Sequence, residues 1–178
     1  MRHSLSFSLL FIKKQPMKHS LLAATLFTVF TGCTDKAVLR ATDEHNKQLV
    51  RTYFNEAWNK GNVSVLDTLL SKDYINHTPS VPNPPQGPEG LKPIIKAIRT
   101  AFPDLHYEIK DLIATPDRVV ARVVMTGTHT GTLFGMPATG KRIEVNQINI
   151  EAVEHGRIKS HWRVTDELTL MKQIGVVK

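Results

Sequence analysis

Hydrophobic positions in the C-terminal part of the chain recur at every second residue, which is the period of a half-buried β-strand. Four such segments follow Pro103, and they are rich in Val, Ile and Thr. Short turn sequences such as Thr115-Pro116-Asp117 and His155-Gly156 separate them. The segments predicted as strands are residues 105–114, 118–130, 141–154 and 157–165.

Before Pro103 the apolar residues recur at helical spacing instead. The predicted elements are a helix from Thr42, which can cap it, to Lys60-Gly61, a short helix after Asn62, an extended segment at 74–77, a proline-rich loop at 79–88, and a helix from Pro88 to Phe102. Helices followed by an antiparallel meander predict one α+β domain over residues 42–178. We expect its N-terminal helices to pack on a curved antiparallel sheet.

The first 33 residues are predicted to be an export signal. Residues 1–18 are basic without a single acid, and residues 21–30 form an apolar run that is too short to span a bilayer as a helix. The run ends in Phe30-Thr31-Gly32-Cys33, which resembles a bacterial lipobox, and Met17 offers an alternative start. We therefore expect lipidation of Cys33 and a tether at residues 34–41. The predicted location is a bacterial membrane, with the lipoprotein facing the periplasm or the cell exterior.

The basic balance of the chain comes partly from this leader. The formal net charge is +7, but four basic residues and no acid precede Cys33, which leaves 19 basic against 16 acidic residues beyond it. No basic stripe with interleaved aromatic residues follows, so nucleic acid is not a predicted partner. Cys33 is the single cysteine, and no disulfide or thiolate nucleophile is expected. The membrane is expected to be contacted through the lipid anchor only.

A carboxylate ends the last predicted strand. From Arg157 to Asp166 the residues alternate, which places the side chains of Ile158, Ser160, Trp162, Val164 and Asp166 on one face and those of Lys159, His161, Arg163 and Thr165 on the solvent face. An apolar environment would raise the pKa of Asp166 and suit it to proton transfer. The same residues also allow Asp166 to N-cap a helix that Gly175 ends.

Polar residues among inward positions of other strands are further candidates. His129 shares a strand face with Val123 and Met125, and His77 precedes the proline-rich loop. Gln147 and Asn149 also have inward parity, where amides need partners. Each of these side chains can serve the core or line a pocket. The spacing of the histidines does not indicate a metal site, and no cofactor motif is present.

Several motifs, in order, carry a resemblance to a known family. They are Tyr53-Phe54-Asn55-Glu56-Ala57-Trp58-Asn59-Lys60-Gly61, Asp73-Tyr74-Ile75-Asn76-His77, Gly90-Leu91, Phe102-Pro103-Asp104, Gly127-Thr128-His129-Thr130-Gly131, Phe134-Gly135, Pro137-Ala138-Thr139-Gly140-Lys141, His161-Trp162, Asp166 and Gln173-Ile174-Gly175. Together they resemble the SnoaL-like polyketide cyclases, also called ester cyclases, of the nuclear transport factor 2-like superfamily. The resemblance implies an α+β cone with an internal pocket. It also implies that Asp166 is the general acid/base of an intramolecular aldol closure without metal or cofactor.

The inward polar and aromatic residues, taken together with the resemblance, lead to a set of functional expectations. The catalytic residues would be Asp166, His77 and His129, and the substrate-binding residues would be Tyr53, Trp58, Gln147 and Trp162. The expected partner is a small apolar carbonyl or polyketide-like compound in the pocket, while monomer and homo-oligomer both stay open. The alternative is a lipid-anchored module that binds a small molecule without chemistry.

Overall fold

The structure is a computed structural model that describes residues 24–178, with side chains described from residue 35. The chain divides into two compact units, Met1–Ala37 and Val38–Lys178. The predicted leader up to residue 23 and the side chain of Cys33 lie outside the described residues, so lipidation stays a prediction. From residue 24 onward, no helix combines the length and apolar character that a membrane span requires.

The first helix, α1, covers Ala24–Thr52, so the prediction of a helix that begins at Thr42 is wrong. The Thr42 hydroxyl donates to the carbonyl of Val38, four residues earlier, as a side chain inside a helix does. Residues 34–41 contain neither Gly nor Pro and hold good helix formers, which explains why the helix extends through the predicted tether. The boundary between the two units falls inside α1.

The end of this helix is confirmed. The π-helical turn η1, Tyr53–Asn59, continues α1 and buries Tyr53, Phe54, Ala57 and Trp58. Gly61 follows with a φ of 73°, a backbone conformation that glycine adopts without a steric penalty. The short helices η2, Val63–Val65, and α2, Leu66–Leu69, come next. The third predicted helix is α3, Pro88–Ala101, with proline at its first position.

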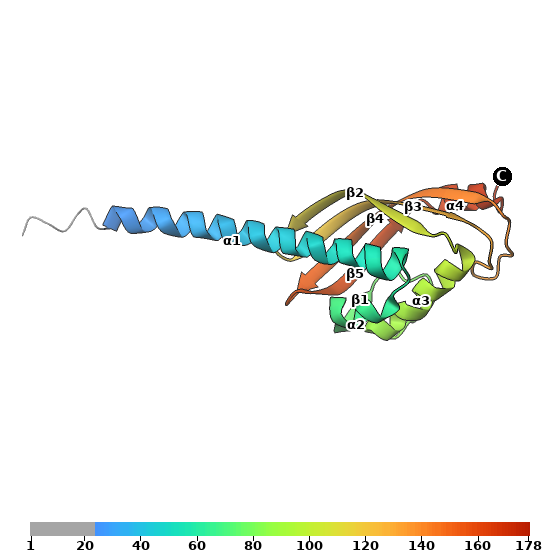
Figure 1. The fold of residues 1–178 in the computed structure, drawn as a ribbon, viewed down its shortest axis with the longest axis horizontal. Helices are drawn as coiled ribbons and strands as arrows, with labels where there is room; N and C mark the ends of the chain where they lie inside the picture. The colour runs from blue at the N-terminus through green and yellow to red at the C-terminus, as the bar shows by residue number, and fades with distance from the viewer. Residues whose placement is uncertain (1–23) are drawn as a thin grey trace, which may run out of the picture. The chain divides into compact units, whose positions relative to one another are not determined.

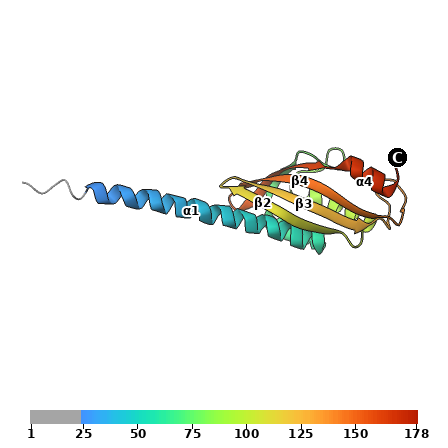
Figure 2. The ribbon, with the colours of Figure 1, turned by 90° about the horizontal axis from the view of Figure 1, so that it is seen from above.

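Five strands form one sheet in the order β1-β5-β4-β3-β2. Their bounds are Leu70–Asn76 for β1, His106–Thr115 for β2, Arg118–Thr128 for β3, Arg142–Glu154 for β4 and Arg157–Thr165 for β5. The meander from β2 to β5 is antiparallel as predicted, and Figure 2 shows β2, β3 and β4 side by side. The edge strand β1 pairs with β5 in parallel, so the sheet is mixed rather than purely antiparallel.

One face of the sheet carries the core. The helices α2 and α3 lie on the same side of the sheet (Figure 1). The buried sheet side chains that join this core include Val119, Val123, Met125, Ile143, Val145 and Ile158. The last helix, α4 (Glu167–Ile174), lies at one end of the sheet, where Gln173 exchanges hydrogen bonds with the backbone of Glu144. The predicted α+β architecture is therefore confirmed.

Candidate functional site

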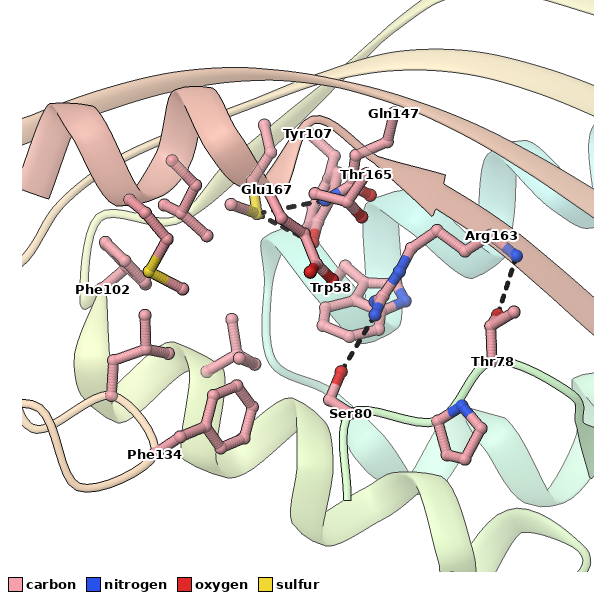
Figure 3. Close-up of a pocket in the computed structure, with 16 residues that line it drawn as sticks. Trp58, Thr78, Ser80, Phe102, Tyr107, Phe134, Gln147, Arg163, Thr165 and Glu167 are labelled. Atoms are coloured by element: carbon pink, nitrogen blue, oxygen red, sulfur yellow. Dashed lines mark hydrogen bonds between the residues drawn. The ribbon is translucent and has the colours of Figure 1, made fainter. Parts of the chain in front are cut away.

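A cavity of about 430 Å³ lies between the inner face of the sheet, α3 and the loop after β1. Much of its lining is apolar, from Trp58, Ile98, Phe102, Met125, Leu133, Phe134, Leu170 and Met171. Polar side chains gather on the wall formed by β4 and β5, and Thr78 and Ser80 of the loop face them (Figure 3). An apolar cavity with a few convergent polar groups is the usual form of a small-molecule site.

Strand β5 presents its side chains to this cavity in the opposite sense to the prediction. Its register with β4 shifts between Ile158 and Ser160, which makes Lys159 an extra residue at a β-bulge. A one-residue shift exchanges the two faces of a strand. As a result His161 is 5% exposed, whereas Val164, predicted to point inward, is 73% exposed.

The bulge creates three polar cross-strand pairs on the inner face, which we call the polar ladder. Its rungs are Gln147 with Thr165, Asn149 with Arg163, and Glu151 with His161. Gln147, Asn149, Glu151 and His161 are each at most 5% exposed. Gln147, Arg163 and Thr165 line the main cavity. Asn149 and His161 line a second cavity of about 10 Å³, which shares Arg163 and Gln147 with the main one and which we call the inner extension.

The innermost rung is a buried acid and base in direct contact. Oε1 of Glu151 lies 2.8 Å from Nδ1 of His161. If Glu151 is ionised, Nδ1 must carry the proton and donate it, because a carboxylate can only accept. The other carboxylate oxygen, Oε2, is buried without a hydrogen-bond partner among the described residues.

The middle rung holds a guanidinium group against the loop. The Arg163 side chain donates to Oγ of Ser80 over 2.9 Å, and its backbone N–H donates to Oγ1 of Thr78 over 2.8 Å. These bonds attach the loop to β5 and fix the cation at the cavity wall (Figure 3). Across the rung, the Asn149 amide nitrogen is buried, and no described residue accepts its hydrogen bond.

The outer rung opens into the main cavity. The Gln147 amide and the Tyr107 hydroxyl both approach the sulfur of Met125, at 3.6 and 3.1 Å (Figure 3). Burial raises the pKa of Tyr107 to about 12, so its hydroxyl stays protonated and able to donate at neutral pH. The hydroxyl of Thr165 is buried without a partner in the described part of the chain.

The prediction that Asp166 faces an apolar pocket is wrong. Asp166 is exposed and caps α4, since its Oδ1 accepts the backbone N–H of Thr169 over 3.0 Å. Hydrogen bonds from Thr169 lower the pKa of Asp166, the opposite of the predicted direction. The next residue, Glu167, lines the cavity instead, on its more exposed side.

The other predicted site residues divide into two groups. Tyr53 lines the inner extension, and Trp58 and Gln147 line both parts of the cavity. His77 and Trp162 do not line it, because they stack on each other with ring centroids 4.4 Å apart and Trp162 belongs to the outer face of β5. His129 is fully buried behind the lining residue Phe102, with its Nδ1 3.1 Å from Oγ1 of Thr139.

The sequence did not predict the charged or titratable residues Glu151, His161, Arg163 and Glu167 of the site, and it did not predict Tyr107 or Thr165 either. The available signal was the run of inward polar residues on β4, where Glu151 has the same parity as Gln147 and Asn149. Such a run requires polar partners on the neighbouring strand. Among the side chains that the structure describes, from residue 35 on, no group of three potential metal ligands comes together.

Comparisons with known proteins all find relatives in the same family. The model of the SnoaL-like polyketide cyclase family matches residues 48–174. The aklanonic acid methyl ester cyclase DnrD of Streptomyces peucetius is 30% identical over 122 residues, which cover 67% of this chain and 84% of that protein. The nogalonic acid methyl ester cyclase of Streptomyces nogalater is 26% identical over 120 residues, covering 67% of this chain and 90% of that protein.

Solved structures show the same relationship. TsrD from Streptomyces laurentii superposes with a TM-score of 0.69 at 30% identity, over 75% of this chain and 97% of that one. IdmH from Streptomyces antibioticus superposes with a TM-score of 0.64 at 30% identity, over 72% of this chain and 97% of that one. The predicted family resemblance is confirmed by both kinds of comparison.

Proposed function

Because this chain belongs to the SnoaL-like polyketide cyclase family, we propose that it is an ester cyclase that closes a ring in a polyketide-like carbonyl compound by an intramolecular aldol reaction. The observation that carries the proposal is the 430 Å³ cavity, which combines an apolar lining with the polar ladder on one wall and a carboxylate at its edge. Three curated relatives, all methyl ester cyclases, support the same reaction class.

The proposed reaction needs one base, one acid and support for a developing negative charge. A base removes the proton from a carbon next to a carbonyl group, and the electron pair moves onto the carbonyl oxygen as an enolate. The enolate carbon attacks a second carbonyl of the same molecule, a C–C bond forms, and the new alkoxide takes a proton. All atoms are retained, so the product is an isomer of the substrate.

Glu167 is the base that we propose for this reaction. It is the carboxylate that lines the cavity among the described residues, and its exposure to water lets it exchange the proton afterwards. The donors of the polar ladder would stabilise the enolate oxygen. The resemblance implies the same catalytic role for Asp166 instead. We assign the role to Glu167 because the Asp166 carboxylate caps α4.

Purified protein incubated with aklanonic acid methyl ester and, separately, with nogalonic acid methyl ester tests the proposal. We expect conversion to a product of unchanged mass and altered retention on chromatography. Glu167→Gln should slow the conversion about 100-fold or more, the usual contribution of a general base. Asp166→Asn is the matched control, because it makes the same change one residue earlier, and it should leave the rate within a few fold.

The opposite ranking of these two variants would return the catalytic role to Asp166. If the wild-type protein converted neither ester, the proposed activity would be contradicted. Circular dichroism of each variant checks that a lost rate does not come from lost folding.

A further inference from the structure

The guanidinium group of Arg163 is a cation in the cavity wall, and it has no acidic partner among the residues that the structure describes. No carboxylate oxygen of the described residues lies within 4.0 Å of its nitrogens, and its side-chain bond goes to the neutral Ser80 hydroxyl. The carboxylate of the next rung, Glu151, is bonded to His161. Because a partly buried charge is stable when it is paired, Arg163 is suited to receive an anion from outside the chain.

Unpartnered donors surround the same point. The Asn149 amide nitrogen, on the same rung as Arg163, and the Thr165 hydroxyl, two residues along β5, are buried, and no described residue bonds to either. Asn149 is only 2% exposed. A buried donor without a partner costs free energy, so these two donors beside the Arg163 guanidinium group indicate a ligand that accepts hydrogen bonds.

The shape of the cavity limits what can reach these donors. The inner extension that Arg163, Asn149 and His161 line has about 10 Å³, which is room for about one oxygen-sized group. The main cavity in front of it has 430 Å³ and a largely apolar lining. The ligand that fits both parts has a larger apolar body and a single projecting oxygen.

We propose that the middle rung of the polar ladder is an oxyanion subsite, which binds the negatively charged oxygen of an apolar carboxylate or enolate. Arg163 supplies the charge, Asn149 and Thr165 supply hydrogen bonds, and the apolar lining holds the body of the ligand. The subsite deepens the proposed function, because it states which end of the substrate enters first and where an enolate oxygen rests. Binding can be measured without turnover, so the subsite and the cyclase activity can fail separately.

Isothermal titration calorimetry of the full chain near neutral pH tests the subsite with two pairs of probes. The first pair is 2-naphthoate and its neutral isostere 2-naphthamide, which tests a carboxylate. The second pair is dimedone, which is largely an enolate near neutral pH, and neutral 3,3-dimethylcyclohexanone. We expect at least one anion to bind about tenfold or more tightly than its neutral counterpart, since charge-assisted bonds are the strong ones.

Variants test which residues cause the preference for the anionic probes over the neutral ones. Arg163→Gln should remove it, Arg163→Lys should retain part of it, and Asn149→Asp should weaken the anions while it leaves the neutral probes unchanged. Arg122→Gln is the matched control, because Arg122 bonds to Asp111 at an exposed position and does not line the cavity. The preference should survive there.

Preference for naphthoate alone assigns the subsite to carboxylates, and preference for dimedone alone assigns it to enolates. Equal affinity within both pairs, including no measurable binding of any probe, would overturn the proposal. A preference that persists in Arg163→Gln would overturn it as well.

Discussion

Glu151 and His161 face each other across β4 and β5, with 2.8 Å between Oε1 and Nδ1, on the buried face of the sheet. Both residues are almost completely removed from solvent, at 0% and 5% exposure. Each therefore depends on the other for its hydrogen bonding and, when both are ionised, for its charge.

Glu151→Ala is expected to destabilise the fold by about 3 kcal/mol, because it leaves a buried imidazole without its acceptor and opens a space in the core. Urea unfolding followed by circular dichroism measures the change. Glu154→Ala, an exposed carboxylate on the same strand, is the control and should stay within about 0.5 kcal/mol of wild type. Equal effects of the two substitutions would show that the pair contributes no more than a surface group.

Replacing both partners of this pair provides a second check. The double variant Glu151→Leu with His161→Leu should recover much of the stability that Glu151→Ala loses, because apolar residues can replace a buried polar pair without leaving an unpaired group. A double variant that is less stable than either single one would contradict this explanation.

Asp166 should stabilise the protein through its cap and in a pH-dependent way. Asp166→Ala should lower Tm at neutral pH, and Asp166→Asn should retain most of the stability because its amide oxygen can still accept from Thr169. The pKa of Asp166 is lowered in the fold, so its contribution is present above the unfolded pKa and is lost as the pH falls through the folded one.

The difference in Tm between wild type and Asp166→Ala should therefore shrink as the pH falls below about 4. Thermal unfolding at several pH values measures it. A higher Tm for Asp166→Ala at neutral pH would mean that the carboxylate is poorly solvated, as the strand alternation indicated.

The bulge at Lys159 determines which side chains reach the cavity. Deleting Lys159 would let Ser160 follow Ile158 directly opposite Ala152, which restores regular pairing and leaves His161 and Arg163 on the inner face. We therefore expect the deletion variant to fold and to keep the anion preference. Lys159→Ala keeps the chain length and removes only the contact with Asp73 on the surface, so it should change Tm little. Loss of the anion preference in a well-folded deletion variant would contradict this account of β5.

Cys33→Ser tests the predicted lipid anchor. We expect wild type in the membrane fraction, and the variant either released or retained as an unprocessed precursor. A single acyl chain binds membranes only marginally, so the anchor requires the multiple acylation that is typical of bacterial lipoproteins. Mass spectrometry of the N-terminus is the measurement. Full-length protein with an intact N-terminus outside the membrane fraction would rule the anchor out.

The strands from β2 to β5 could be predicted because the alternation of Val, Ile and Thr is a local signal. The pairing of β1 with β5 could not, because it joins segments more than 80 residues apart and depends on the path of α3 between them. The start of α1 was misplaced because a residue that can cap a helix, Thr42, is also tolerated inside one.

The site was predicted only in part, for one physical reason. Tyr53 and Trp58 continue the helical spacing of apolar residues that begins in α1, and Gln147 follows the alternation of β4, so their inward positions follow from sequence. Arg163 lies beyond the bulge, and a one-residue insertion leaves no mark in a strand that carries polar residues on both faces. For this reason the sequence predicted Asp166 as the carboxylate at the cavity, whereas the structure places Glu167, the next residue, there.

The rate of ring closure of aklanonic acid methyl ester by wild type and by Arg163→Gln, with each conversion followed at constant mass, tests the central claim most directly. The account predicts that wild type forms the isomeric product, that 2-naphthoate or dimedone inhibits competitively, and that Arg163→Gln loses both the rate and the inhibition. Ring closure by Arg163→Gln at the wild-type rate would contradict the claim that the polar ladder is where the chemistry occurs.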